Sequence, residues 1–321
     1  MLQRTIGVLT SGGDAPGMNA AIRSVVRAAL KKGFRVVGVQ RGYNGLIHGE
    51  MFEMNMRSVS NIINRGGTIL YTARCPEFRE LSGVLKAKEV CEKAGICGIV
   101  VIGGDGSFRG AADLSAQGIP CVGVPATIDN DISCTEYAIG YDTAMNTAVE
   151  MIDKIRDTAE SHDRCNVIEV MGRHAGHIAV NTGIACGATT IIIPEIEFNM
   201  DEIIDKLRTA HKMGKQHFIV LVAEGIGKVD EIAKHIQEAT GIESRSTILG
   251  HVQRGGSPSV KDRVTASTMG YYAVNLLEKS IGNRVIGIKN DHVVDYDIQE
   301  ALSMKKPFEV DLYNIANEIS F

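Results

Sequence analysis

Short apolar runs rich in β-branched residues recur along this chain, and they constrain its fold more than any other feature. The runs are TIGVLT at 5–10, RVVGVQ at 35–40, CGIVVIGG at 97–104, PCVGVP at 120–125, NVIEVM at 166–171, TTIIIP at 189–194, FIVLVAEG at 218–225 and RVIGIK at 284–289. Helical patterns lie between most of them, the clearest over residues 145–159, where apolar side chains follow an i, i+3, i+4, i+7 spacing. Nearly continuous apolar strands that alternate with helices indicate parallel sheets covered on both faces. The predicted fold class is therefore α/β.

Bulk composition excludes several classes of partner. The chain has 321 residues, of which 44% are hydrophobic, so it can bury a core in one large domain or two. Its 34 basic and 38 acidic side chains give a formal charge of −4, so no global field draws it to nucleic acid or to a membrane surface. The longest apolar runs fall far below the ~18 residues of a membrane span. The seven cysteines form neither a CxxC pair nor a zinc-like spacing. We expect a cytoplasmic globular protein with reduced thiols.

Three polar or Gly-rich turns follow predicted strands, which is where ligands bind in α/β sheets. The first, SGGDAPGMN at 11–19, approaches a P-loop in its glycine spacing, but Met18 and Asn19 stand where Lys and Ser or Thr are required. Bare backbone N–H groups of Gly12 and Gly13 can still receive a phosphate at the start of a helix. The alternative is an ordinary tight turn.

The second turn, GGDGSFRG at 103–110, does not match a dinucleotide fingerprint. It places one carboxylate, Asp105, among small residues that let a polyphosphate approach the backbone. A single aspartate is a common ligand for a Mg²⁺ ion that keeps most of its waters. This turn favours phosphoryl transfer, without saying which kinase superfamily.

The third turn contains Asp129 and Asp131 in the stretch PATIDNDIS. If the segment is extended, both side chains leave the same face, and two carboxylates ~6 Å apart at an effective dielectric of ~20 repel by ~3 kcal/mol. A functional site would justify that cost. The alternative is a simple turn, because Asp and Asn side chains mimic backbone hydrogen bonds.

A run of cations predicts a phosphate site. Arg245, His251 and Arg254 fall within ten residues, and Arg173 and Arg164, which flank the predicted strand at 166–171, can join them. Each arginine alone is more often a solvated surface residue. Several near strand ends favour a doubly charged phosphate, which planar guanidinium groups bind in bidentate fashion.

These motifs resemble those of the bacterial ATP-dependent 6-phosphofructokinases over essentially the whole chain. The matching stretches are LTSGGDAPGMNAAIR, INRGGTILYTARCPEF, VVIGGDGS, TIDNDI, IRDTAESH, EVMGRHAG, VAEG and R-x4-G-H-x-Q-R-G-G-x5-D-R from Arg245 to Arg263. The resemblance implies transfer of the ATP γ-phosphoryl group to the 1-hydroxyl of fructose 6-phosphate, with Mg²⁺ as cofactor. It also implies the phosphofructokinase fold: two Rossmann-like three-layer domains with mostly parallel sheets. The larger, ATP-binding domain would comprise residues 1–139 and 253–303, and the smaller, sugar-phosphate-binding domain 140–252 and 304–321.

The resemblance assigns the catalytic residues. Asp129 is similar to the general base that accepts the proton of the sugar hydroxyl, and Thr127 lies beside the transferring group. Asp131 supports the site, Arg173 stabilises charge on the transferred phosphoryl group, and Asp105 is the Mg²⁺ ligand.

The resemblance also assigns the binding residues. Those implied for ATP are Gly13, Arg74, Cys75, Gly104, Asp105, Gly106 and Ser107. Those implied for the sugar phosphate are Thr127, Ile128, Asp129, Arg164, Met171, Gly172, Arg173, Glu224, Arg245, His251, Val252, Gln253 and Arg254. In the family, Arg164 and Arg245 reach in from a neighbouring subunit, so a homotetramer with shared active sites is expected.

The phosphoryl donor follows from two small residues. Pyrophosphate-using relatives typically carry Asp at position 106 and Lys at 126, whereas this chain has Gly106 and Ala126. A carboxylate at 106 would repel the α-phosphate of a nucleotide. ATP is therefore the expected donor, although Ala126 replaces the usual glycine of ATP users.

The family's effector site for ADP and phosphoenolpyruvate is only partly matched. The matching residues are Arg23, Arg27, Arg156, Gly187, Lys215 and His217. The departures are Met56, Met213 and Gln216 where cations are usual, and Thr189 where a glutamate contributes to the effector's metal site. Charged hydrogen bonds contribute ~1.5–3 kcal/mol each, so we expect intact catalysis with blunted or altered regulation. The alternative for Arg23 and Arg27 is a solvated helix face.

Two other functions compete with this interpretation. One is a pyrophosphate-dependent or broader sugar-phosphate kinase. The other is a catalytically silent relative that only binds nucleotide or partners. Such proteins usually lose the base or the metal ligand, and here Asp105, Asp129 and Arg173 are all present.

Overall fold

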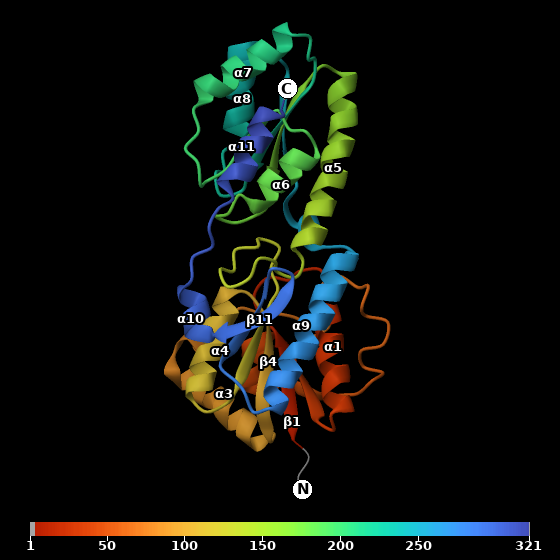
Figure 1. Ribbon diagram of the computed structural model, residues 1–321, viewed down its shortest axis with the longest axis vertical. Coiled ribbons are helices and arrows are strands. Elements are labelled where there is room, and N and C mark those ends of the chain that lie inside the picture. The colour runs from red at the N-terminus through yellow and green to blue at the C-terminus, as the bar shows by residue number, and fades with distance from the viewer. Residues whose placement is uncertain (1–3, 321) are drawn as a thin grey trace. The chain divides into compact units, whose positions relative to one another are not determined.

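The computed structural model describes residues 4–320 and contains two compact units (Figure 1). The first comprises Met1–Ile128, Ile132–Thr143 and Arg254–Lys306, and the second Asp129–Asp131, Ala144–Gln253 and Pro307–Phe321. Residues 1–3 and 321, which the predicted domain ranges include, lie outside the described residues. The chain passes from one unit to the other near the predicted boundaries, except that the second unit also includes Asp129–Asp131. That the units are separate binding domains stays a prediction.

The first unit contains a seven-stranded sheet in the order β11-β10-β5-β4-β1-β2-β3. The strands are β1 (Thr5–Thr10), β2 (Arg35–Val39), β3 (Met51–Met54), β4 (Ile96–Gly103), β5 (Cys121–Pro125), β10 (Arg284–Lys289) and β11 (His292–Asp297). Only the two edge strands, β3 and β11, pair antiparallel with their neighbours. The carboxyl ends of the central strands therefore meet at one edge of the sheet.

Helices cover both faces of this sheet, as the complete burial of β1 requires. The helices are α1 (Met18–Lys31), α2 (Gly42–His48), α3 (Leu81–Lys93), α4 (Asp105–Ala116), α9 (Val260–Glu278) and α10 (Ile298–Ser303), with the 3-10 turn η1 (Pro76–Arg79). Side chains of α2, α3, α4 and α10 form one apolar core with the sheet. On the other face, α1 and α9 pack so closely that a Cβ on Gly270 would lie 2.9 Å from the carbonyl oxygen of Ala21.

The second unit contains a four-stranded parallel sheet in the order β7-β8-β6-β9. Its strands are β6 (Cys165–Val170), β7 (Thr190–Ile192), β8 (Phe218–Ala223) and β9 (Ser244–Ile248). Its helices are α6 (His177–Ala185), α7 (Met200–Lys212), α8 (Val229–Thr240) and α11 (Val310–Glu318), with η2 (Gly250–Arg254) after β9. Helix α5 (Tyr141–Ser161) begins in the first unit and continues in the second.

The two faces of the smaller sheet carry different helices. Helices α7 and α8 bury their apolar sides against alternate residues of β6 and β8. Helix α6 lies on the opposite face, where a Cβ on Gly183 would meet the side chains of Ile191 and Leu221. The Tyr313 hydroxyl of α11 donates to the Ile191 carbonyl oxygen at 3.3 Å. The predicted α/β class is confirmed, with both sheets dominated by parallel pairs.

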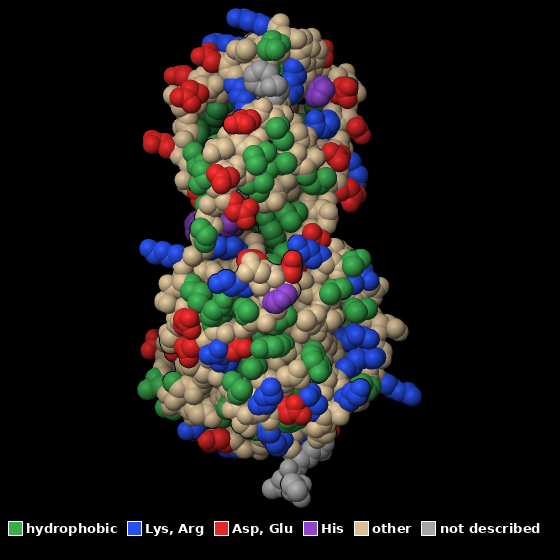
Figure 2. Space-filling model, viewed as in Figure 1, with side chains coloured by type: hydrophobic (Ala, Val, Ile, Leu, Met, Phe, Trp, Pro, Cys, Tyr) green, Lys and Arg blue, Asp and Glu red, His purple; other side chains and the backbone are tan. Residues whose placement is uncertain are grey.

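Charged side chains of both signs intermingle on the face shown in Figure 2. Among residues 4–320 no helix is long and apolar enough to cross a membrane. The seven cysteines are free thiols, and five of them are buried: Cys91, Cys121, Cys134, Cys165 and Cys186. Burial raises the pKa of the Cys186 thiol to about 11 and of each of the other four to about 12.

Candidate active site

The turn between β1 and α1 brings a cation against glycine backbone. Gly12 and Gly17 have φ angles of 87° and 110°, which favour glycine over residues with a Cβ. A Cβ on Gly13 would lie 2.6 Å from Nη1 of Arg254. That same nitrogen donates to the carbonyl oxygen of Asp14 at 3.2 Å. The structure thus places Arg254, predicted to bind the sugar phosphate, beside Gly13, predicted to bind ATP.

The turn between β4 and α4 lies against the β1–α1 turn. A Cβ on Gly103 would come within 2.4 Å of the Ser11 carbonyl oxygen and 2.5 Å of the Ser107 hydroxyl. By contrast, nothing lies within 4 Å of a Cβ built on Gly104 or Gly106. These open glycines sit at the N-terminus of α4, where unpaired N–H groups and the helix dipole favour an anion. We call Gly13 together with Gly104–Ser107 the glycine cradle.

Asp105 is the first residue of α4 and supplies the carboxylate of the cradle. Burial raises the pKa of the Cys134 thiol to about 12, and the negative charge of Asp105 adds to that shift. Among residues 4–320 no group of three or more His, Cys, Asp or Glu side chains is arranged to hold a metal ion. A lone carboxylate beside open backbone fits a Mg²⁺ ion that takes its other ligands from phosphate and water.

The predicted nucleotide ligands Arg74 and Cys75 belong to a segment tied to the same turn. The Thr72 hydroxyl donates to the Gly12 carbonyl oxygen at 2.7 Å. Cys75 packs against the core shared by α2, α3 and α4. This segment therefore enters the vicinity of the cradle from a third part of the chain.

The backbone after β5 is hydrogen-bonded to the end of β4, directly before the cradle. The Ala126 N–H donates to the Gly103 carbonyl oxygen at 2.9 Å, and the Thr127 N–H donates to the Ile139 carbonyl oxygen at 3.0 Å. Ile128 is fully buried. The position of Thr127 is thus set by β4 and by residue 139.

Asp129 and Asp131 do not lie on an extended segment. Asn130, between them, has φ 51°, so the chain turns there and the alternation of side chains along a strand does not apply. The condition for both carboxylates to leave one face is therefore not met, and the segment turns, as in the alternative interpretation. Asp129 is 3% exposed, and Asp131 pairs with Arg173, Oδ2 to Nη1, at 3.6 Å. The Arg173 side chain is 67% exposed, so this ion pair leaves the guanidinium accessible.

Two predicted sugar ligands hold the loop that carries Arg173. The Oε1 atom of Gln253 accepts from the Met171 N–H at 2.9 Å, and Oε2 of Glu224 accepts from the Gly172 N–H at 3.1 Å. Gln253 is completely buried, whereas its predicted neighbours His251 and Val252 are exposed. Glu224 and Gln253 thus fix this loop.

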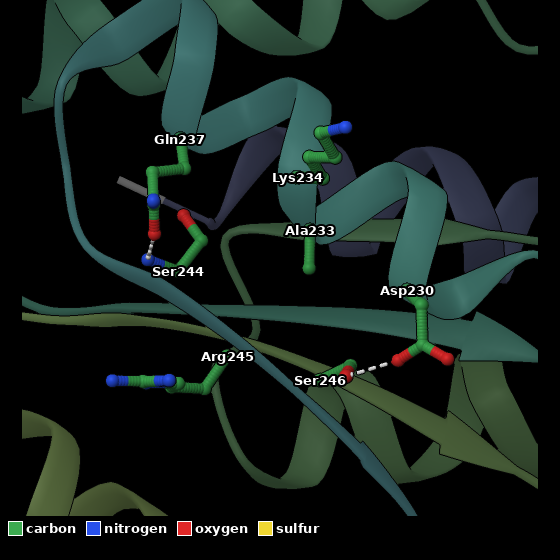
Figure 3. A pocket seen from close by; sticks show the side chains of 7 residues that line it. All are labelled: Asp230, Ala233, Lys234, Gln237, Ser244, Arg245 and Ser246. Carbon is green, nitrogen blue, oxygen red and sulfur yellow. Dashed lines mark hydrogen bonds between the residues drawn. The ribbon is translucent and has the colours of Figure 1, made fainter.

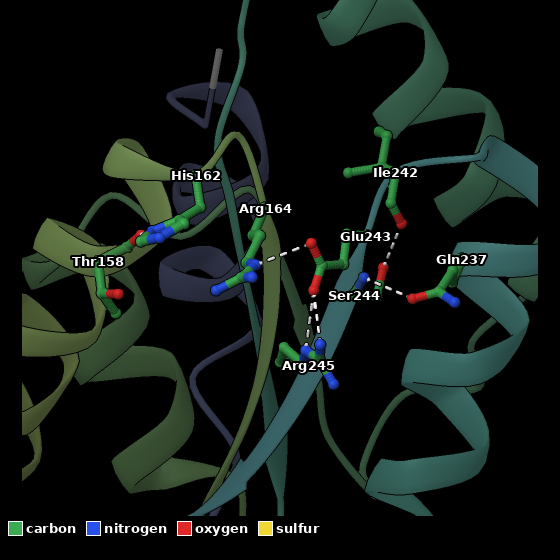
Figure 4. Close-up of polar contacts among 8 residues, drawn as sticks. All are labelled: Thr158, His162, Arg164, Gln237, Ile242, Glu243, Ser244 and Arg245. Carbon is green, nitrogen blue, oxygen red and sulfur yellow. Dashed lines mark hydrogen bonds and ion pairs between the residues drawn. The ribbon is translucent and has the colours of Figure 1, made fainter.

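Arg164 and Arg245 share one carboxylate, that of Glu243 (Figure 4). Arg164 Nε lies 3.0 Å from Glu243 Oε2, and Arg245 Nη2 lies 2.7 Å from Oε1. Hydrogen bonds from the two arginines hold the pKa of Glu243 below its ordinary value. We call Arg164 and Arg245 the arginine pair. Sequence reasoning missed Glu243, because an isolated glutamate reads as a surface residue.

The arginine pair lies at the opposite end of the small sheet from Arg173. Arg164 precedes β6, Arg245 pairs in register with Asn166, and Arg173 follows the end of β6. At ~3.3 Å per residue, the strand separates the two groups by roughly 20 Å. The arginines that the sequence analysis grouped as one phosphate site therefore form separate groups within a single chain.

Arg245 also lines an open pocket of about 410 Å³ between α8 and β9 (Figure 3). The Gln237 side chain accepts from the Ser244 N–H at 3.0 Å, and the Ser246 hydroxyl donates to Asp230. These contacts fix β9 against α8, which positions Arg245.

The predicted effector residues fall into two cation groups. Arg23 and Arg27 share a face of α1, where burial and then repulsion by Arg27 lower the pKa of Arg23. In the second unit, burial and then repulsion by Arg156 lower the pKa of Lys215. Burial and then Lys215 lower the pKa of Lys206, a third cation that sequence reasoning missed.

The remaining effector positions surround the second group. Arg156 donates to the carbonyl oxygen of Cys186, next to Gly187, whose φ is 58°. His217 is half-buried, while Thr189 is buried and Met213 is 75% exposed. The residues that depart from the family pattern thus include both a buried side chain and an exposed one.

Comparisons with known proteins identify the family of this chain. The profile of the family described as phosphofructokinase matches residues 5–277. The chain is 58% identical over 317 residues to an ATP-dependent 6-phosphofructokinase of Clostridium botulinum and 56% identical to one of Bacillus cytotoxicus, with 99% of each chain covered in both comparisons.

A solved structure shows the same fold. Phosphofructokinase from Saccharomyces cerevisiae matches with a TM-score of 0.91 and 32% identity. The match covers 98% of this chain and 50% of the yeast chain, so this chain spans half of that longer protein. Fold, family profile and identity over the full length of the bacterial relatives lead to one conclusion: the chain belongs to the phosphofructokinase family.

Proposed function

We propose that this chain is an ATP-dependent 6-phosphofructokinase, a glycolytic kinase that acts in the cytoplasm. It transfers the γ-phosphoryl group of ATP to the 1-hydroxyl of fructose 6-phosphate and yields fructose 1,6-bisphosphate and ADP. The observation that carries the proposal is the glycine cradle, whose open Gly104 and Gly106 flank Asp105, in a chain 58% identical to bacterial enzymes of that name.

The cradle supports ATP as the donor. The space beside Gly106 is open, so a nucleotide phosphate can approach the backbone. Ala126 is 1% exposed, so the side chain at this position is small, enclosed and uncharged, and it supplies none of the charge that a lysine gives in pyrophosphate-using relatives. A pyrophosphate-dependent enzyme would need charge at both positions.

Each catalytic residue has a distinct task in this mechanism. Asp129 accepts the proton of the sugar 1-hydroxyl as that oxygen attacks phosphorus, a step in which a general base contributes ~10²–10⁴-fold. Thr127 lies two residues earlier on the tethered backbone. Arg173 stabilises negative charge on the transferred group, and Asp131 orients Arg173 through their ion pair.

Asp105 would hold Mg²⁺, which supplies neutralisation of phosphate charge when bound. The remaining work of the protein is positioning. The N–H groups at the start of α4 bind the polyphosphate, and Arg254 presents a second cation at the β1–α1 turn.

The arginine pair supports active sites shared between subunits of a homotetramer. Because Arg164 and Arg245 lie roughly 20 Å of strand from Arg173, they do not complete the site of their own chain. They project from the amino end of the small sheet and bind the sugar 6-phosphate held by a neighbouring copy.

Regulation is expected to be weak. The second-unit cation group contains Arg156 and Lys215, but neutral Met213 and Gln216 replace two cations. Half-saturation by fructose 6-phosphate should therefore shift less than about threefold with ADP or phosphoenolpyruvate. A several-fold shift by both effectors would contradict this expectation.

The decisive experiment is a coupled steady-state assay with fructose 6-phosphate and either ATP or pyrophosphate. We expect turnover with ATP and Mg²⁺ that exceeds turnover with pyrophosphate at least 100-fold. Comparable rates with both donors would replace the proposal with a broader sugar-phosphate kinase. Nucleotide binding without turnover of any sugar phosphate would indicate a catalytically silent relative.

A further inference from the structure

Among the described residues outside the predicted site, Asp262 carries the most deeply buried carboxylate. It lies in the first turn of α9 and is 0% exposed. Its Oδ1 accepts from the Tyr137 hydroxyl at 2.8 Å and from the Gly140 N–H at 2.7 Å. Its Oδ2 accepts from the Thr143 N–H at 2.9 Å and from the Thr143 hydroxyl. Four donors thus converge on one charge from a segment more than a hundred residues away in sequence.

Capping of α9 does not explain this arrangement. The Ser259 hydroxyl oxygen already caps the helix by accepting from the Asp262 N–H at 3.2 Å. An acid that merely complements the helix dipole can remain solvated in the first turn, whereas Asp262 is buried and aimed at residues 137–143. Burial of a charge is costly unless hydrogen bonds satisfy it, and here those bonds also hold the donors of residues 137–143 in place.

The segment 137–143, which we call the strap, is packed tightly along its length. Gly140 has φ 102°, and a Cβ there would lie 2.6 Å from that of Ala15. On the other side of this contact, a Cβ on Gly17 would lie 2.6 Å from the Ile139 side chain. The strap therefore lies between the start of α9 and the β1–α1 turn.

The strap holds the backbone that leads to the predicted base. Ile139 pairs with Ala126 as an isolated parallel bridge. Its N–H donates to the Pro125 carbonyl oxygen at 3.0 Å, and its carbonyl oxygen accepts from the Thr127 N–H at 3.0 Å. These two bonds are the observed contacts by which the strap sets the direction of the chain as it leaves β5.

We propose that Asp262 is a positioning residue for phosphoryl transfer: its carboxylate locks the strap, and the strap in turn aligns Thr127 and the backbone entering Asp129. The inference rests on the proposed kinase function for its catalytic consequence. Asp262 touches neither substrate nor the reacting atoms. It acts through the Ile139–Thr127 hydrogen bond.

The test is Asp262→Asn, which preserves shape but replaces one acceptor oxygen with an NH2 group. In either orientation of the amide, the N–H of Gly140 or of Thr143 faces that NH2 group and loses its acceptor. We expect kcat to fall about 10–100-fold while the KM for each substrate changes less than threefold. The pH profile of kcat should keep the same midpoint on its acid side and decrease only in maximum value, because the base itself is unchanged.

Val274→Ala is the matched control, because it removes buried volume from the same helix about three turns beyond Asp262. Both variants should lower Tm, but the control should keep kcat within twofold. Amide hydrogen exchange gives a readout independent of activity. Peptides covering 137–143 and 126–128 should exchange faster in Asp262→Asn and unchanged in Val274→Ala.

The outcomes separate this inference from the proposed function. If wild type lacks kinase activity, the proposed function fails, and exchange at 126–128 still decides the structural coupling. If wild type is active and Asp262→Asn keeps kcat within twofold, the positioning role is overturned. Should Asp262→Asn not fold, Tyr137→Phe combined with Thr143→Val removes two donors more mildly. That double variant should lower kcat about 3–10-fold, and unchanged kcat would again overturn the role.

Discussion

The glycine cradle and the arginine pair are both expected to bind phosphate, yet one uses backbone groups and the other uses charged side chains. The cradle presents backbone N–H groups and open space beside Gly104 and Gly106, and one chain supplies all of it. The arginine pair presents two flexible charged side chains oriented by Glu243. Backbone donors are fixed by the fold, whereas the arginines depend on a shared counterion and, in the proposed tetramer, on a neighbouring copy. Substitutions that fill the open space should therefore impair phosphate binding by the cradle, whereas substitutions that remove charge should impair phosphate binding by the arginine pair.

We expect the largest effect on activity from Asp129, the proposed general base, which belongs to neither the glycine cradle nor the arginine pair. Asp129→Ser removes the proposed proton acceptor, so kcat should fall ~10²–10⁴-fold with a modest change in KM. Steady-state kinetics and thermal unfolding of the same preparation check this. Activity within a few-fold of wild type would remove Asp129 from its assigned role.

Crowding of the cradle should give the next largest effect. In Gly106→Asp, a carboxylate ~4–5 Å from a phosphate at an effective dielectric of ~20 repels it by ~3–4 kcal/mol per unit charge. We expect kcat/KM for ATP to fall about 10²–10³-fold. Gly106→Ala is the control, because a Cβ there meets no atom within 4 Å, and it should stay within about threefold of wild type.

Charge loss in the arginine pair should be milder and confined to the sugar. Arg245→Ala removes charged hydrogen bonds of ~1.5–3 kcal/mol, so the KM for fructose 6-phosphate should rise ~10–100-fold. The KM for ATP should change little. Lys234→Ala, which removes an exposed cation from the same pocket, is the control and should leave both KM values unchanged.

Mixing subunits sharpens the contrast between one-chain and two-chain sites. If sites are shared, hybrids of Arg245→Ala and Asp129→Ser subunits contain some sites with both residues intact. At low fructose 6-phosphate, where both parent preparations are impaired, reassembly should then give more activity than either preparation shows alone. A mixture no more active than its components would argue that each chain completes its own site.

Acidification should produce the smallest effect, through Glu243. Its pKa is lowered in the folded protein by the hydrogen bonds from Arg164 and Arg245. The stabilisation is therefore present above its unfolded value of roughly 4.3 and is lost as pH falls through the lower folded value. Wild type and Glu243→Gln should differ slightly in Tm at pH 7 and converge near pH 3. A difference that grows on acidification would contradict the assignment.

The sequence predicted what depends on local pattern. The eight apolar runs correspond to the eight strands β1, β2, β4, β5, β6, β7, β8 and β10. The three unpredicted strands β3, β9 and β11 lie at sheet edges, where a strand has a hydrogen-bonded neighbour on one side only, and polar residues such as those of SRSTI break the apolar run. Edge strands depend on their neighbours more than on their own composition.

The site divides in the same way. Glycine turns at strand ends were predictable because a glycine spacing records a backbone requirement. Glu243 and Lys206 were not, because each reads alone as a surface charge and gains meaning only from partners distant in sequence. Asp262 belongs to the quoted motif from Arg245 to Arg263, but its partners at Tyr137, Gly140 and Thr143 could not be read from that motif. Asn130 decides between the two alternatives left open for PATIDNDIS, because its left-handed φ makes the segment turn.

The distribution of thiols offers a practical handle on the enzyme. Five cysteines have pKa values of about 11 or 12, so almost none of their sulfur is nucleophilic thiolate near neutral pH. Only Cys75 and Cys97 are half-buried rather than buried. A fluorophore directed at sulfur would thus have two attachment points, and replacing Cys97 would leave a single dye beside the proposed nucleotide site to report occupancy in real time.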